Sequence, residues 1–197
     1  MKNIIEHELK NLTLPVFELS VFILPEGKMR LRIFETKYLK MLSMISSHQM
    51  FVIQLTSKPA GAEHNNWGSL VKIKDFNQGE DGVLEIEVHC CALVQLADIT
   101  LDKNNLVFGK ITYRNHWSQN STDENMTSLE LGTALNDIIN NNTLLNHLYQ
   151  YRSLNNTYWV TARWLELLPV SLKIKSQFAK INTFTHAKDF VDSIIYK

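Results

Sequence analysis

The sequence has too few cysteines for a disulfide-rich or zinc-binding protein. Its 197 residues include two cysteines, Cys90 and Cys91. Because neighbouring residues of a strand point to opposite faces, this adjacent pair provides neither a disulfide framework nor a CxxC redox or zinc motif. Reduced thiols are the simplest interpretation, and we therefore expect a cytoplasmic protein.

The sequence also lacks an excess of charge of either sign. Lysine plus arginine and aspartate plus glutamate each number 20, so no global field draws the chain toward nucleic acid or anionic lipid. A local patch stays open, because Lys28, Arg30 and Arg32 would share one face of a strand and could hold phosphates. Three cations without interleaved aromatic residues more often pair with carboxylates, for which Glu26 and Glu35 are the candidates.

No hydrophobic run at the N-terminal end predicts a membrane span. Residues 14–24 fall short of the roughly 20 residues that a membrane helix needs, and they include Pro15 and Glu18. Residues 1–10 carry acidic side chains where a signal peptide would need an apolar stretch. We expect no membrane anchor and no export.

Common catalytic motifs are absent as well. The sequence contains no GxxxxGK[ST], GxGxxG, GxSxG or HExxH motif. His89 and Cys91 would share a strand face, but a metal site needs a third ligand nearby. Ser171 with Lys173 and Lys175 could suggest a Ser/Lys hydrolase, but a helix-capping serine followed by solvated lysines explains them more simply. We expect no catalytic residue, no cofactor and no metal.

The hydrophobic pattern predicts strands in the first part of the chain. Residues 71–74 (VKIK) and 83–89 (VLEIEVH) alternate apolar and polar side chains, and Asp81-Gly82 between them predicts a hairpin turn. Further short strands are predicted at MFVIQL, CALVQL and LVFGKITY, and Pro25 to Gly27 predicts a turn. A single helix interrupts the strands: Thr36 is its expected N-cap, and its expected inner face consists of Tyr38, Leu39, Leu42 and Ile45.

A change of period after the strands predicts a second, helical part. Residues 116–126 (HWSQNSTDENM) are polar and rich in turn formers, which is typical of a linker. Apolar residues then recur at helical spacing, and Pro169 is expected to end one of the helices. We therefore expect a β-rich domain over 1–115, a linker over 116–126 and a helical bundle over 127–197.

Several blocks of sequence resemble the Lon protease N-terminal (substrate-binding) domain family. That family has patterns close to LPLFPL, FPGG and LPLRIFEPRY, to which residues 14–19 (LPVFEL), 24–27 (LPEG) and 31–38 (LRIFETKY) are similar. Residues 67–73, 81–84 and 166–170 resemble its later segments, so the resemblance covers nearly the whole chain. The positions that carry the signature are Pro15, Pro25, Gly27, Arg32, Phe34, Glu35, Tyr38, Gly68, Gly82 and Pro169.

The resemblance implies an α+β fold, with a PUA-like β-barrel or twisted antiparallel sheet followed by a helical bundle. The chain contains neither an ATPase module nor a peptidase domain, so it resembles a stand-alone member of the family. It departs from the family pattern where Cys90 stands near a glycine position and Leu93-Val94 replaces an Arg-Phe pair. Arg32 and Glu35 are expected to form an ion pair.

By resemblance, the expected role is non-catalytic binding of an unfolded polypeptide or a specific protein partner, as an adaptor or proteolysis-related factor. Trp67, Phe76 and Trp117 are the candidate binding surface, although large aromatic residues are mostly buried and core packing is the competing interpretation. RNA binding is the alternative, because PUA-like folds also occur in RNA-recognising proteins; the neutral net charge argues against it. A hydrolase that uses Ser171 or His89 is the third hypothesis, and a weak homo-oligomer stays open.

Overall fold

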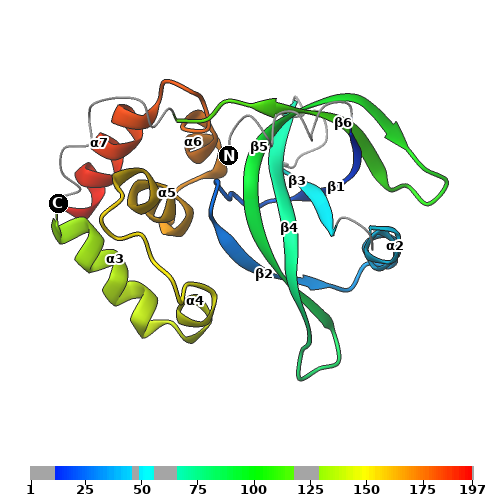
Figure 1. Ribbon diagram of the computed structural model, residues 1–197, viewed down its shortest axis with the longest axis horizontal. Helices are drawn as coiled ribbons and strands as arrows, with labels where there is room; N and C mark the ends of the chain where they lie inside the picture. The colour runs from blue at the N-terminus through cyan, green and yellow to red at the C-terminus, as the bar shows by residue number, and fades with distance from the viewer. Residues whose placement is uncertain (1–11, 46–48, 56–65, 118–128, 197) are drawn as a thin grey trace. The chain divides into compact units, whose positions relative to one another are not determined.

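The computed structural model describes residues 12–45, 49–55, 66–117 and 129–196. The chain divides into two compact units, Met1–Arg114 and Asn115–Lys197, which contain the strands and the later helices, respectively (Figure 1). Most of the expected linker at 116–126 lies outside the described residues. No helix in the described part of the chain is long and apolar enough to cross a membrane.

The first unit contains a six-stranded sheet in the order β2-β5-β4-β3-β1-β6, in which β5 also pairs with β6. Its elements are β1 (Thr13–Leu19), β2 (Lys28–Ile33), α2 (Thr36–Met44), β3 (Met50–Leu55), β4 (Trp67–Gln78), β5 (Leu84–Leu101) and β6 (Val107–Arg114). Every pairing is antiparallel except that of β1 with β3, which is parallel. The expected α+β class is confirmed.

One continuous strand, β5, replaces two of the strands that the sequence predicts. The segments VLEIEVH and CALVQL were expected to be separate, but Leu84–Leu101 forms a single strand. In the register with β4, Val71 lies opposite Cys90 and Leu70 lies opposite Ala92, so Cys91 is an extra residue in a β-bulge. No turn residue stands between the two segments, and the bulge bends the strand without ending it.

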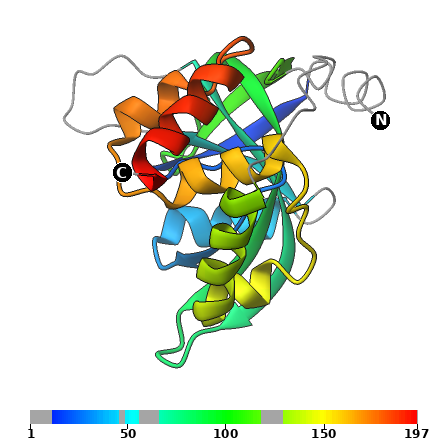
Figure 2. The same cartoon turned by 90° about the vertical axis from the view of Figure 1, so that its left-hand side faces the viewer.

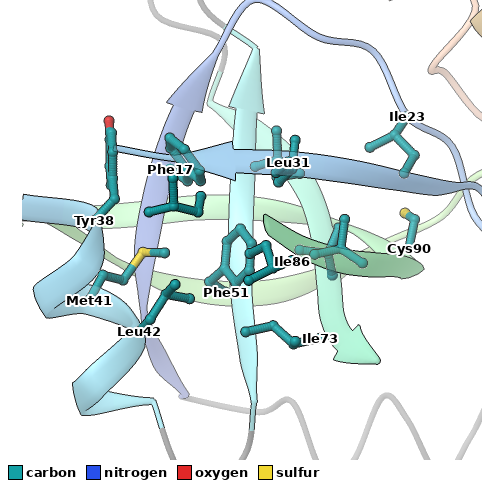
Figure 3. Close-up of a cluster of buried hydrophobic side chains, with 14 of the residues drawn as sticks. Phe17, Ile23, Leu31, Tyr38, Met41, Leu42, Phe51, Ile73, Ile86 and Cys90 are labelled. Carbon is teal, nitrogen blue, oxygen red and sulfur yellow. The ribbon is translucent and has the colours of Figure 1, made fainter. Parts of the chain in front are cut away.

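The first core cluster fills one side of this sheet. Phe17 of β1, Phe51 of β3 and Ile86 of β5 point toward one another, and Tyr38 and Met41 of α2 cover them (Figure 3). The ring centroids of Phe17 and Tyr38 are 3.8 Å apart. Full burial of an apolar side chain of this size stabilises a fold by about 1.5–3 kcal/mol, so this cluster holds α2 against the sheet.

The second core cluster is formed by residues that alternate with those of the first. Val16, Val52 and Leu70 each stand next in sequence to a member of the first cluster. They pack with Val94 and Leu96 of β5. Side chains of successive strand residues point to opposite faces. The sheet is therefore buried on both faces where β1, β3 and β4 meet.

The structure corrects two expectations for α2. Its N-cap is Glu35 and no side chain caps it, so Thr36 is the first helical residue. Tyr38 and Leu42 are buried as expected, but Leu39 is 41% exposed. An α-helix turns by 3.6 residues, so Tyr38, Leu42 and Ile45 share a face that Leu39 does not.

Both predicted turns are confirmed. The N–H of Gly27 donates to the carbonyl of Leu24 at 2.9 Å, and Glu26 adopts a left-handed conformation with φ of 67°. The hairpin between β4 and β5 has Gly82 at φ of 80°, and it projects beyond the rest of the first unit in both views (Figures 1 and 2).

The regular secondary structure of the second unit, in its described residues, consists of helices. Its helices are α3 (Leu129–Asn141), α4 (Thr143–Leu148), α5 (Thr157–Leu167), α6 (Leu172–Gln177) and α7 (Phe184–Ile195). Helix α5 packs against α3 and α7, as Figure 2 shows. The indole N–H of Trp164 donates to the carbonyl of Leu131 at 3.1 Å and ties α5 to α3. Helix α5 ends two residues before Pro169, as the sequence predicts.

The second unit also buries charged side chains. Arg163 is 1% exposed and donates through Nε and Nη2 to the two carboxylate oxygens of Glu166, both at 2.7 Å. Lys175 is 7% exposed, and its Nζ donates to the carbonyl of Glu166 at 2.8 Å. The expectation of a solvated Lys175 is therefore wrong, and burial lowers the pKa of its ammonium group.

Substituting Gly68 with alanine should destabilise the first unit. A Cβ at Gly68 would lie 2.7 Å from the carbonyl oxygen of Ile53 and closer still to Val52 Cγ1, so β4 and β3 would have to separate. We expect the free energy of unfolding in urea to fall by about 1–3 kcal/mol. Lys74→Ala, at an exposed position of β4, is the control, and equal midpoints for the two variants would contradict the prediction.

The pKa of Lys175 predicts a pH dependence of stability. Its folded pKa is lower than the usual 10.5, so between the two values the unfolded chain binds more protons than the folded chain. The free energy of unfolding should therefore rise with pH in that window relative to the variant Lys175→Met. Urea denaturation from neutral pH to pH 10.5 measures this difference, with Lys173→Met at an exposed position as the control. A constant difference across the range would exclude this effect.

Candidate functional site

Two exposed phenylalanines lie at the hairpin end of the first unit. Phe76 of β4 is 48% exposed, and Phe34, directly after β2, is 73% exposed. In the register, Phe76 lies opposite Ile86, which lies opposite Leu31 of β2. Both phenylalanines therefore belong to the same three-stranded region near the turn at 79–83, where Phe76 lies on the face of Leu31 and Phe34, which follows Ile33, lies on the other face. We call Phe34 and Phe76 the hairpin-end aromatic pair.

Of the three aromatic residues expected at the binding surface, Phe76 alone is exposed. Trp67 is 6% exposed, and the guanidinium carbon of Arg114 lies 4.9 Å from its ring centroid. Burial lowers the pKa of Arg114. Trp67 and Phe76 stand at opposite ends of β4, which at about 3.3 Å per residue separates them by roughly 30 Å. They do not form one surface.

Trp117 is part of the interior of the second unit. Its Nε1 donates to the carbonyl of Phe178 at 3.0 Å and to the hydroxyl of Thr183 at 3.2 Å. Its ring meets that of Phe184 edge to face, with centroids 5.2 Å apart. A buried indole usually satisfies its N–H in this way, so Trp117 joins the segment before α7 to the rest of the unit.

Phe34 is the residue that sequence reasoning missed as a surface candidate. It was assigned to the family signature, but alternation along β2 gives a signal for its exposure. Leu31 and Ile33 are buried, so the next position in an extended chain should point away from the core. The exposed Phe34 fits that alternation.

A network of charges runs across β2 and β5 beside the aromatic pair. Arg30 Nη2 lies 2.7 Å from Glu87 Oε1, and Arg30 Nη1 lies 3.4 Å from Glu85 Oε2. Arg32 pairs with Asp81, and its Nε lies 3.8 Å from Glu85 Oε1. The hydrogen bond from Arg30 to Glu87 raises the pKa of Arg30 further, and the N–H of Val83 lowers the pKa of Asp81.

The expected ion pair between Arg32 and Glu35 is wrong. Arg32 reaches across to the hairpin, and the Glu35 carboxylate instead lies 3.7 Å from Lys37 Nζ. The expectation that Arg30 and Arg32 pair with carboxylates holds, but those carboxylates come from β5 and the hairpin turn. Strand pairing brings them together from more than 45 positions away in the sequence.

The residues considered for catalysis have structural contacts. The Ser171 hydroxyl accepts from the N–H of Ile174 and caps α6, and Lys175 donates to Glu166. Burial raises the pKa of the Cys91 thiol, which is the opposite of an activated thiolate. Within the described ranges, no group of three His, Cys, Asp or Glu side chains is placed to bind a metal ion.

Two solved structures resemble the chain over most of their length. A Lon N-terminal domain protein from Xanthomonas campestris superposes with a TM-score of 0.67 at 23% identity and covers 92% of this chain and 98% of its own. The N-terminal domain of the Mycobacterium avium complex Lon protease gives a TM-score of 0.66 at 9% identity, covering 92% and 97%. These similarities show the fold.

A comparison with curated proteins finds no match. A family model does match, and it is described as the ATP-dependent protease La (LON) substrate-binding domain. It covers residues 13–184, which span most of both units and include all the sequence blocks that resemble the Lon pattern. The chain therefore belongs to the Lon substrate-binding domain family.

Proposed function

We propose that the chain is a non-catalytic module that binds extended or unfolded segments of other proteins, and that it acts in the cytoplasm as an adaptor or proteolysis-related factor. Membership of a substrate-binding family supports the protein-binding role. The observation that carries the proposal in this chain is the hairpin-end aromatic pair, because phenylalanine has no polar group that solvent exposure would satisfy.

The physical basis is the burial of apolar surface at a small number of anchors. Phe34 and Phe76 are 73% and 48% exposed, whereas neighbouring apolar residues of the same strands, such as Leu31 and Ile73, are buried. Exposed aromatic residues that can be covered by a partner contribute strongly to protein interfaces. An unfolded segment offers apolar side chains that could cover either ring.

The structure gives less support to RNA binding. That hypothesis depends on the cations of β2, and Arg30 and Arg32 are paired with Glu85, Glu87 and Asp81. A phosphate would have to compete with these carboxylates. Retention on RNA that weakens as salt rises would nevertheless favour it over the proposal.

Substitution of the aromatic pair tests the proposed function. Phe34→Ser and Phe76→Ser should each weaken binding of a fluorescently labelled, permanently unfolded polypeptide roughly tenfold, because each removes a partly exposed aromatic anchor. Both positions are exposed, so the thermal midpoint should change little. Fluorescence anisotropy measures the affinity.

Tyr151→Ser is the matched control, since Tyr151 is an aromatic residue of the second unit that is 88% exposed. Trp67→Ala is a poor probe of binding, because removal of a buried indole destabilises the fold by about 3–5 kcal/mol. Equal affinities for the wild type and both phenylalanine variants would show that the binding surface lies elsewhere.

A further inference from the structure

Arg114 differs from the other two arginines of the first unit because no described carboxylate is paired with it. Arg30 and Arg32 form ion pairs with carboxylates of β5 and of the hairpin turn. Among the described residues, the contact of the Arg114 side chain is with the ring of Trp67, whose centroid lies 4.9 Å from the guanidinium carbon. Burial lowers the pKa of Arg114, so its positive charge is partly removed from water and has no described counter-charge.

The contact with Trp67 leaves the guanidinium group of Arg114 able to donate hydrogen bonds. The face of an aromatic ring attracts a cation, but it offers no oxygen acceptor to the five N–H groups of an arginine side chain. The Arg114 nitrogens are not among the buried, unpaired polar atoms of the described residues, so a ligand can reach them from solvent. Trp67 is itself buried, and its ring therefore supports the guanidinium from a fixed position.

Two uncharged polar side chains share this face of the sheet with Arg114. In the register, Trp67 of β4 lies opposite Gln95 of β5, and Gln95 lies opposite Thr112 of β6. Arg114 follows Thr112 by two residues, so both point to the same face, and the guanidinium of Arg114 reaches across β5 to Trp67. Gln95 is half-buried and Thr112 is exposed. An amide and a hydroxyl that can donate therefore stand beside the guanidinium.

A carboxylate matches these donors in both shape and charge. The planar guanidinium can donate two parallel hydrogen bonds to the two oxygens of one carboxylate. The single negative charge of a carboxylate equals the charge of Arg114. The next cation on this face of β6 is Lys110, four residues from Arg114 and so about 13 Å away along the strand. A phosphate group, with a charge of about −1.5 to −2 at neutral pH, would not be neutralised by Arg114 alone.

The Arg114 group lies far from the hairpin-end aromatic pair. Trp67 and Phe76 stand at opposite ends of β4, roughly 30 Å apart. An extended polypeptide of about ten residues covers such a distance, and it carries carboxylates on its acidic side chains and at its C-terminus. Apolar and acidic groups of one bound polypeptide could therefore be held at separate places on the first unit.

We propose that Arg114, with Gln95 and Thr112 beside it, forms a binding site for one carboxylate group of a bound polypeptide. This proposal rests on the proposed polypeptide-binding function and names a chemical group that the chain recognises. Arg114 donates the paired hydrogen bonds, Trp67 holds the guanidinium in place, and the amide and hydroxyl donate to the remaining lone pairs of the carboxylate. An acidic side chain and a C-terminal carboxylate share this chemistry, and the peptides below separate the two sources.

Titration of the whole chain with acetate tests the site in the absence of a polypeptide. In proton–nitrogen NMR spectra, the signals of Arg114 Nε–H and Trp67 Nε1–H should shift and saturate as acetate is added at constant ionic strength. The variant Arg114→Gln should abolish the shift of the Trp67 signal. Lys110→Gln removes a cation from the same face of β6 and should leave that shift unchanged.

Two results of this titration would overturn the proposal. One is the absence of a saturable shift with acetate, or a shift that Arg114→Gln and Lys110→Gln reduce equally, since either would show that no defined site exists at Arg114. The other is tighter binding of inorganic phosphate than of acetate, which would show that the site does not prefer a carboxylate.

Short peptides identify the source of the carboxylate. A peptide of five residues spans at most about 18 Å, so it cannot reach both Trp67 and Phe76. The first peptide has a central aspartate and blocked ends, the second has asparagine in its place, and the third is the asparagine peptide with a free C-terminal carboxylate. The first or the third should bind roughly tenfold more tightly than the second, because a neutral amide loses the charge-assisted hydrogen bonds. Equal affinities for all three would overturn the proposal.

Variants of Arg114 separate this inference from the proposed function. Arg114→Lys keeps the charge but loses the planar fork, so the preference for the carboxylate peptide should fall several-fold while the thermal midpoint stays close to that of the wild type. If unfolded polypeptide binds through Phe34 and Phe76 but the peptide preference does not depend on Arg114, this inference is wrong and the proposed function stands. If acetate binds at Arg114 but no polypeptide or peptide binds, the proposed function is wrong, and so is the assignment of the carboxylate to a polypeptide.

Discussion

The first unit depends on one long strand, β5, and on the bulge that allows it to serve two cores. Ile86, Val88 and Cys90 lie in the first core cluster, whereas Val94 and Leu96 lie in the second. All five are even-numbered, and in a regular strand they would point to one face. The extra residue at Cys91 shifts the alternation by one position, so the same strand packs one face before the bulge and the other face after it.

This arrangement also explains why β2 has an unpaired edge. Strand β4 pairs along β5 from Leu84 to Gln95, while β2 and β6 pair with different lengths of β5, Leu84 to His89 and Leu93 to Leu101. The five strands from β5 through β4, β3 and β1 to β6 return to β5, so their pairings are closed. Only β2 lies outside that closed set among the described strands. The position of β2 at the end of the strand order therefore follows from the length of β5.

Local signals in the sequence predicted local structure. Asp81-Gly82 predicted the hairpin and Pro25 to Gly27 predicted a turn because both depend on the backbone preferences of adjacent residues. The partners of Arg32 could not be predicted in this way, since Asp81 and Glu85 meet it only after β2 pairs with β5. The bulge at Cys91 is also a property of the register between strands, and the sequence around it contains no glycine or proline that would indicate it.

The burial of the aromatic residues also depends either on local sequence or on contacts between distant segments. Trp117 is buried, and Phe178 and Thr183, which are distant in sequence, accept its N–H. Trp67 is covered by Arg114 from another strand. Phe34, in contrast, is exposed for a local reason, because it follows the buried Ile33. Alternation along β2 could therefore have predicted the exposure of Phe34 from the sequence. Position beside a turn predicted exposure less well, because Trp67 is buried.

The cations of β2 also bear on whether its edge can pair with the same edge of a second copy. If two copies of the chain paired through β2, the rows that contain Arg30 and Arg32 would face each other, and like charges directly opposite one another destabilise a strand pair. Charged residues on an edge are a common protection against such self-association. Cross-strand repulsion between these rows would therefore disfavour the pairing of two copies through β2.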